Sequence, residues 1–204
     1  MSTLFISDLH LSDHEPERIQ LAVDFIKNET ADCNALYILG DLFNTWLGDD
    51  LVPPAFLPLV EQLQKRHQSG IKIYLMVGNR DFMMGKHFAH QIGAQLLGDT
   101  QVIDLYGTPT LLMHGDTLCI DDVDYQRYRK WTRSKLLQWL FLHLPTSYRQ
   151  KISDKIKQKS REQKQYKSSM IMDVNHTELD KVLSQHKVKY LIHGHTHRPE
   201  IHHL

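Results

Sequence analysis

Leu4-Phe5-Ile6-Ser7-Asp8-Leu9-His10 is the stretch of sequence that decides the fold. It begins as an apolar run typical of a buried strand and ends in a carboxylate and an imidazole. Because residues two apart on an extended chain point to the same face, the side chains of Asp8 and His10 can hold one cation.

The same pattern occurs four more times along the chain. Apolar runs at residues 35–39, 71–77, 110–113 and 188–192 lead into Gly40-Asp41, Gly78-Asn79-Arg80-Asp81, His114-Gly115-Asp116 and His193-Gly194-His195-Thr196-His197. All five runs favour buried strands. Ligands of open α/β sheets bind beyond the carboxyl ends of the strands, so we expect the five polar clusters to meet at one place.

The segments between these runs predict an α/β fold made of two sheets. Helical spacing of apolar residues over 15–28 makes the first fifty residues a βαβ unit with parallel strands, and further helices are expected at 53–67, 86–91 and 173–186. Short strands at 95–97, 101–105 and 110–113 predict a second, partly antiparallel sheet. We expect a two-sheet sandwich flanked by helices, with residues 42–50 forming a loop over the site.

Composition bounds the domain organisation and the cellular location. The 204 residues predict a single domain spanning 1–204, with a basic, mainly helical cap inserted at 123–170. Residues 124–167 hold thirteen Lys or Arg and three acidic residues, although the net charge of the whole chain is zero. Such a segment favours an anionic ligand or surface. The absence of a signal-peptide pattern and of a membrane-spanning apolar run predicts a cytoplasmic protein, and two isolated cysteines predict structural thiols.

The clusters together carry the ligands of two metal ions. Asp8 with His10 and His195 with His197 are repeated pairs, and the two oxygens of Asp41 allow this carboxylate to bridge two cations. Asn79 adds an amide oxygen and His114 another imidazole. A nitrogen and oxygen set without sulfur suits Mn²⁺, Fe²⁺, Co²⁺ or Zn²⁺. Two adjacent metals activate water for attack at phosphorus, so the predicted reaction is hydrolysis of a phosphoester or phosphoanhydride.

The ordered set of motifs resembles the calcineurin-like metallophosphoesterase family, whose pattern is Asp-x-His, Gly-Asp, Gly-Asn-His, His-Gly and Gly-His-x-His. The matching positions are Asp8/His10, Gly40/Asp41, Gly78/Asn79, His114/Gly115 and Gly194/His195/His197. Arg80 stands where many members have histidine. This departure, together with the residues at 79–82, 114–119, 171–175 and 193–199, resembles the branch that hydrolyses the diphosphate of UDP-2,3-diacylglucosamine in lipid A biosynthesis.

The resemblance implies a dinuclear site, with Mn²⁺ as the preferred metal. One metal would be held by Asp8, His10, Asp41 and His197, and the other by Asp41, Asn79, His114 and His195. A bridging hydroxide would attack the α-phosphorus and release UMP and 2,3-diacylglucosamine 1-phosphate. The catalytic residues would be Asp41, Asn79, Arg80 and His114, and the substrate contacts Asn79, Arg80, Asp122, Ser160, Lys164, Lys167 and His195.

Arg80 agrees with a diphosphate substrate. A phosphate monoester leaves as an anion without needing a proton, whereas a sugar alkoxide needs one. Because an arginine can bind charged phosphate oxygens through two hydrogen bonds, it suits a phosphate leaving group better than an acid does.

The cap would serve the lipid part of such a substrate. Residues 131–144 offer an apolar surface and residues 151–167 a cationic one, which together fit acyl chains beside a diphosphate and an anionic membrane surface. We therefore expect a peripheral location on the cytoplasmic face of the inner membrane. The alternative for the cap is an ordinary pair of solvated helices that binds no lipid. In the loop at 42–50, Phe43 and Trp46 either pack internally or contact acyl chains.

Two other functions stay open at this point. A nuclease or another phosphodiesterase of the same fold would share the metal site, but we expect no nucleic acid partner and no stable protein partner. A non-catalytic scaffold is expected to have lost ligands, and all seven are present here. The family usually continues with further strands beyond the position of Leu204, so we also expect a complete site in a domain of reduced stability.

Overall fold

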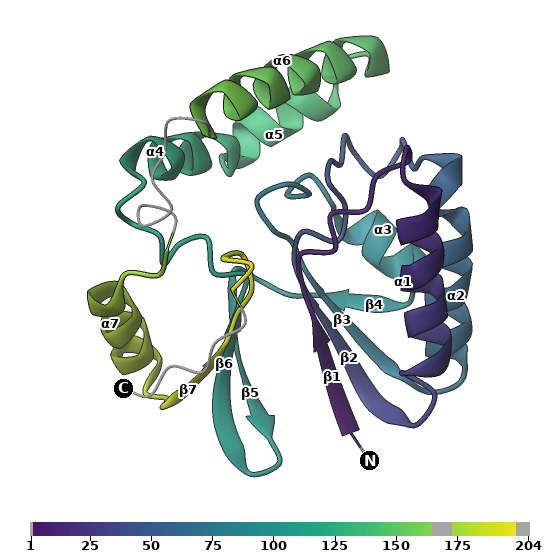
Figure 1. The fold of residues 1–204 in the computed structure, drawn as a ribbon, viewed down its shortest axis with the longest axis vertical. Coiled ribbons are helices and arrows are strands. Elements are labelled where there is room, and N and C mark those ends of the chain that lie inside the picture. The colour runs from purple at the N-terminus through teal and green to yellow at the C-terminus, as the bar shows by residue number, and fades with distance from the viewer. Residues whose placement is uncertain (1, 165–172, 199–204) are drawn as a thin grey trace.

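Two β-sheets form the centre of the structure and helices cover their outer faces (Figure 1). This computed structural model describes residues 2–164 and 173–198, with only the backbone described for 159–164. The first sheet is parallel and has the order β1 (Ser2–Ile6), β2 (Cys33–Leu39), β3 (Lys72–Met76) and β4 (Ala94–Leu96). In the second sheet β6 (Thr108–Met113) pairs antiparallel with β5 (Thr100–Leu105) and parallel with β7 (Tyr190–Ile192).

The helices fall into three groups. The outer face of the first sheet is covered by α1 (Pro16–Asn28), the short 3₁₀ helix η1 (Pro54–Phe56), α2 (Leu57–Gln68) and α3 (Lys86–Gln91). The second sheet is covered by α7 (His176–His186). The remaining helices, α4 (Val123–Thr132), α5 (Lys135–Leu142) and α6 (Thr146–Lys164), lie together beyond one end of the sheets, at the top of Figure 1.

Alternation along β2 explains why the two sheets face each other. Leu36 and Ile38 point to the core under α1 and α2, whereas the intervening Tyr37 and Leu39 point to the second sheet. Tyr37 stacks between Phe5 and Tyr74, with ring centroids 5.0 and 4.4 Å away. Both faces of this strand are therefore buried, as its nearly continuous apolar sequence predicts.

The second sheet uses the same alternation. Leu112 of β6 faces the first sheet, and its neighbours Leu111 and Met113 pack in the core that includes Leu179 and Leu183 of α7. The resulting order of layers is helices, sheet, sheet and helix, which confirms the predicted sandwich.

The partner of β4 differs from the prediction. The sequence placed residues 95–97 in the second sheet, but β4 pairs with β3 in the first, with Ile73 opposite Ala94 and Leu75 opposite Leu96. The physical reason is that α3 acts as a short crossover helix, which returns the chain parallel to β3. The change to antiparallel pairing occurs only after Gly98.

The aromatic residues of the 42–50 loop pack internally. Phe43 and Trp46 are 0% and 3% exposed, and their rings stack at 4.7 Å. Phe43 also contacts Phe56 and Phe88, at 4.4 and 5.7 Å between centroids. Of the two alternatives for these residues, packing is the one observed, because neither ring is available to an acyl chain.

The α4–α6 region exposes much of its apolar surface. Neither α4 nor α5 contains a buried residue, and Trp131, Leu136 and Trp139 are 71%, 65% and 55% exposed.

Within the described residues, no helix combines the length and the apolar character that crossing a bilayer requires.

Candidate metal centre

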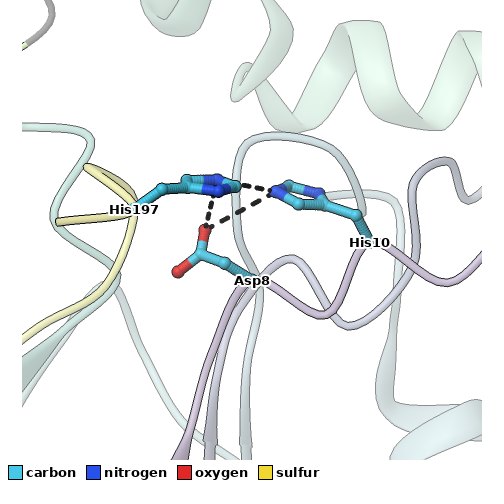
Figure 2. A group of neighbouring side chains, drawn as sticks. All are labelled: Asp8, His10 and His197. Atoms are coloured by element: carbon cyan, nitrogen blue, oxygen red, sulfur yellow. Dashed lines mark hydrogen bonds and ion pairs between the residues drawn. The ribbon is translucent and has the colours of Figure 1, made fainter. Parts of the chain in front are cut away.

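Asp8, His10 and His197 converge from opposite ends of the chain (Figure 2). The two imidazoles face each other with their Nε2 atoms 3.0 Å apart. Oδ1 of Asp8 lies 3.8 Å from His10 Nε2 and 3.7 Å from His197 Nε2. The three ligand atoms thus surround one point beyond the end of β1.

A second group forms beyond β2, β3 and β6. Oδ1 of Asn79 lies 2.9 Å from His114 Nε2 and 2.9 Å from His195 Nδ1. Oδ2 of Asp41 lies 3.8 Å from the same His114 nitrogen. Two imidazoles, an amide oxygen and a carboxylate therefore share this position.

Asp41 connects the two groups. Its Oδ2 lies 3.6 Å from His10 Nδ1, and ligand atoms of Asp8, Asp41 and His114 all lie within 4.8 Å of one another. All seven side chains predicted as metal ligands are thus brought into one cluster. The arrangement offers two adjacent positions with a carboxylate between them.

Unsatisfied polar atoms show that this cluster fits cations. Asp8 Oδ1 and His10 Nδ1 are buried without a hydrogen-bond partner, two of only three such side-chain atoms among the described residues. Buried polar atoms are normally satisfied, and an atom that is not calls for an explanation such as a bound ion. A carboxylate oxygen and an imidazole nitrogen are both good ligands for a divalent transition metal.

The pKa shifts of the cluster favour the ligand forms of its histidines. Burial, with the nearby charge of Arg80, lowers the pKa of His10 to about 4, and burial together with His114 lowers the pKa of His195 to about 4. Both imidazoles are neutral at pH 7 and have a lone pair to donate. Burial raises the pKa of Asp41 to about 7, because the charged carboxylate is poorly solvated there. A bound cation would stabilise the charged form.

The backbone is in an unusual conformation at most of these residues. Seven non-glycine residues of the described chain have a positive φ, and five of them are Asp8, His10, Asp41, His195 and His197. This left-handed conformation is uncommon for residues with a side chain and concentrates at functional sites. It turns each side chain away from the strand direction and toward the cluster.

Glycines in the motifs allow the close approach of these loops. A Cβ at Gly78 would lie 2.1 Å from Asp41 Oδ1, and one at Gly194 would lie 2.2 Å from Asp8 Oδ2. Any larger residue would displace a carboxylate of the cluster. The glycines of the Gly-Asn and Gly-His motifs are therefore needed for the close packing of these loops.

Asp81 holds together the loops that follow β2 and β3. Its carboxylate is fully buried and accepts hydrogen bonds from the backbone N–H groups of Gly78, Asp41 and Phe43 at 2.7, 3.3 and 3.3 Å. Burial raises its pKa, and the N–H groups of Gly78 and Phe43 oppose that shift. Sequence reasoning placed Asp81 in one of the five polar clusters expected to meet at the site but gave it no role there, although its place beside Asn79 and Arg80 was a signal.

Helix α4 adds contacts that the sequence pattern did not indicate. The ring of Tyr125 stacks on His195 at 6.1 Å, and Arg133 donates through Nη2 to the Gly78 carbonyl at 2.9 Å. Arg129 and the Tyr125 hydroxyl both donate to Asp116 Oδ2. A helix distant in sequence thus supports the loops that carry His195 and Asn79.

The predicted substrate contacts are placed less uniformly. The backbone N–H of Arg80 donates to Asp41 Oδ1 at 2.7 Å, and its guanidinium Nη1 lies 3.4 Å from Asn44 Oδ1. The carboxylate of Asp122 caps α4 by accepting from Tyr125 N at 3.0 Å. Ser160 and Lys164 are in α6 among residues described by backbone alone, and Lys167 lies outside the described residues.

Known proteins are similar to this chain over nearly its whole length. Its sequence is 48% identical over 200 residues to a UDP-2,3-diacylglucosamine hydrolase of Histophilus somni, covering 98% of this chain and 86% of that protein. The proteins of the same name from Photobacterium profundum and Serratia proteamaculans are 46% and 47% identical over 204 residues, covering 100% of this chain and 83% and 85% of theirs. Residues 1–199 match the calcineurin-like phosphoesterase family, and the chain therefore belongs to that family.

Proposed function

We propose that this chain hydrolyses the diphosphate of UDP-2,3-diacylglucosamine, releasing UMP and 2,3-diacylglucosamine 1-phosphate for lipid A biosynthesis. The observation that carries the proposal is the complete cluster of seven ligand side chains in a chain 45–48% identical to hydrolases named for that substrate.

Two divalent cations, with Mn²⁺ as the preferred metal, would occupy the cluster. Asp8, His10, Asp41 and His197 would hold one, and Asp41, Asn79, His114 and His195 the other. When bound, the cations supply an activated water and neutralise charge that develops on the phosphoryl oxygens. The left-handed backbone at five of these residues holds their side chains in place before substrate arrives.

Arg80 would bind the phosphate oxygens of the diphosphate. Its backbone is held by Asp41, while its guanidinium is exposed beside the cluster. A guanidinium remains charged at every pH of interest and can donate two parallel hydrogen bonds to a phosphoryl group. It would stabilise the leaving monoester without transferring a proton.

The α4–α6 region would bind the lipid portion and a membrane surface. Exposed apolar residues on these helices include Trp131, Leu136, Trp139 and Leu140, the last 48% exposed. Thirteen Lys or Arg fall at 124–167, the stretch of sequence that includes nearly all of these helices. A surface that is both apolar and basic suits acyl chains and anionic headgroups, so we propose a peripheral position on the cytoplasmic face of the inner membrane.

The remaining substrate contacts are proposed from the family resemblance. They are Asn79, Asp122, Ser160, Lys164, Lys167 and His195, in addition to Arg80. Asp122 also has a structural role as the N-cap of α4, so its replacement is expected to affect both binding and the start of that helix.

UMP release by purified, metal-stripped protein tests the proposal. We expect no turnover of UDP-2,3-diacylglucosamine until Mn²⁺ is added, and none at any Mn²⁺ concentration in Asp41→Ala. The matched control is Asp24→Ala, which removes an exposed carboxylate from α1 and should leave turnover unchanged. Turnover of single-stranded DNA or of simple phosphoesters alone would instead assign another phosphoesterase activity, and metal binding without turnover would indicate a scaffold.

A further inference from the structure

Arg149 of α6 is buried against the 42–50 loop. Its side chain is 3% exposed, and Nη1 donates to the Leu47 carbonyl and to Asp50 Oδ1, both at 2.7 Å. Nη2 donates to the other carboxylate oxygen of Asp50. The guanidinium therefore holds the loop by a bidentate ion pair and by the main chain.

Gly48 shows how tightly the helices meet this loop. Its φ is +131°, and a Cβ there would lie 2.6 Å from Arg149 Nη1 and 2.8 Å from Leu142 Cδ2 of α5. Because the loop has no side chain at this position, the ends of α5 and α6 can approach its backbone directly. The contact thus depends on residues of both helices.

The same loop reaches the candidate metal centre at its other end. It begins directly after Asp41, and Leu11 N and Asn44 N donate hydrogen bonds to the facing carbonyls of Leu42 and Leu11 at 3.0 and 2.9 Å. Asn44 also accepts from the Arg80 guanidinium at 3.4 Å. The loop therefore joins α6 to the segment that carries His10 and to the group proposed to bind the diphosphate.

Stability alone is a poor explanation for this arginine. Nε of Arg149 is buried without a hydrogen-bond partner, while Asp50 has a 59% exposed side chain. Burying a charged group with one donor unsatisfied costs free energy, and a partly exposed pair returns little. Such a pair is better suited to fixing one orientation than to strengthening the fold.

Orientation at Arg149 matters because of the length of α6. Ser160 and Lys164 are on the same helix, and Ser160 lies about 16 Å beyond Arg149 along the axis. A small tilt at Arg149 produces a larger displacement at those positions. Fixing the orientation of α6 near its start thus fixes the distance between the far part of that helix and the candidate metal centre.

We propose that the Arg149–Asp50 ion pair is a positioning device that holds α5 and α6 in register with the metal centre, and so sets the affinity for the lipid-linked substrate. The proposal rests on the proposed function, since it assumes that α6 contacts that substrate. Neither residue is proposed to touch the reacting atoms.

Steady-state kinetics on four proteins test this role: wild type, Arg149→Ala, Asp50→Ala and the double variant. Each single variant should raise KM for UDP-2,3-diacylglucosamine by about tenfold, the loss of one charged hydrogen-bonded pair, with kcat changed by less than about twofold. The double variant should be no worse than Arg149→Ala, because both substitutions break one contact. Arg149→Lys keeps the charge but not the bidentate geometry and should give an intermediate KM.

The matched control removes an ion pair of the same kind elsewhere. Arg18 and Glu15 form an exposed pair at the start of α1 at 3.3 Å, and Arg18→Ala should leave KM unchanged. An unchanged KM in Asp50→Ala and Arg149→Lys, or additive effects in the double variant, would overturn the proposal. Because Arg149→Lys keeps a charged partner for Asp50, this variant keeps the test decisive if Arg149→Ala or Asp50→Ala fails to fold.

Hydrogen exchange separates failure of this proposal from failure of the proposed function. Peptides from residues 135–158 should exchange faster in Arg149→Ala than in wild type or Arg18→Ala. If wild type shows no turnover of the substrate, the proposed function fails, and exchange alone then decides whether Arg149 holds the helices. Unchanged exchange in these peptides would overturn the positioning role.

Discussion

Arg80 combines a backbone held by Asp41 with an exposed guanidinium, and it is not one of the seven residues proposed as metal ligands. Replacement by histidine tests its role without removing a metal ligand. We expect Arg80→His to lower kcat for UDP-2,3-diacylglucosamine by about 100-fold, the scale of losing a preorganised charged donor, with bound Mn²⁺ unchanged. Turnover and metal content of the same preparation measure the two effects. Equal turnover in wild type and variant would exclude a role for the guanidinium in the reaction.

Asp81 is a residue whose effect should be structural and local. Asp81→Asn places an amide N–H₂ group opposite three backbone donors, so at least one of the bonds from Gly78, Asp41 and Phe43 is lost. We expect a loss of about 3 kcal/mol in the free energy of unfolding, measured with urea. The control is Asp104→Asn at an exposed turn, where the carboxylate accepts from Gly107 N. A similar loss in both variants would show that burial of the Asp81 contacts contributes nothing extra.

At the residue level, the sequence was sufficient to predict which side chains cluster at the strand ends, but not which residues support them. Asp8, Asp41 and the histidines were predictable because each follows directly after a strand, where chain direction alone determines location. Tyr125 and Arg133 were not, because their contacts depend on how α4 packs on loops distant in sequence. No local pattern encodes that packing.

At the element scale, the buried carboxylate of Asp116, just beyond β6, is one of the contacts that attach α4. Asp116 is 3% exposed and accepts from Arg129 Nε at 2.7 Å, while the same arginine donates at 2.9 Å to Asp99, which is 52% exposed. Although burial acts in the opposite direction, the charges of Arg129 and His114 and the hydroxyl of Tyr125 hold the pKa of Asp116 below its ordinary value. The buried partner, not the exposed one, should determine how firmly α4 is attached.

Replacing each of the two carboxylate partners of Arg129 in turn tests whether the buried partner matters more than the exposed one. Asp116→Asn leaves the Arg129 guanidinium without its buried charged partner, with the exposed Asp99 still in place, and should lower the free energy of unfolding by about 3 kcal/mol. Asp99→Asn removes an exposed partner and should cost less than about 1 kcal/mol. Urea unfolding at pH 7 measures both. Equal losses would mean that exposure does not decide the value of these contacts.

The elements themselves were largely predictable, with the exception of strand pairing. Helix α3 was expected at 86–91 and occurs as Lys86–Gln91, because its apolar and polar residues follow helical spacing. The predicted sheet for β4 was wrong, since the sequence of a three-residue strand does not indicate which neighbouring strand it pairs with. Periodicity reports which face is buried but not which strand lies alongside.

For the whole molecule, the candidate metal centre is a junction between the two sheets. Asp8 follows β1 and accepts from His195 N beyond β7 at 2.8 Å, and His114 beyond β6 contacts the Leu39 carbonyl of β2 at 2.9 Å. Cations held by these residues would connect the same two sheets. Metal binding is therefore expected to stabilise the fold as well as to support the reaction.

Removal of metal should for this reason lower the melting temperature. A cation present at about 1,000 times its dissociation constant adds about 4 kcal/mol, which corresponds to roughly 10 °C for a chain of this size. Scanning calorimetry with Mn²⁺ and then with a chelator measures the shift. Asp41→Ala, which lacks the carboxylate between the two positions, should show a much smaller response than wild type. If the chelator left the wild-type melting temperature unchanged, the ions would not connect the sheets, and the ligand loops would have to be held by Asp81 and the α4 contacts alone.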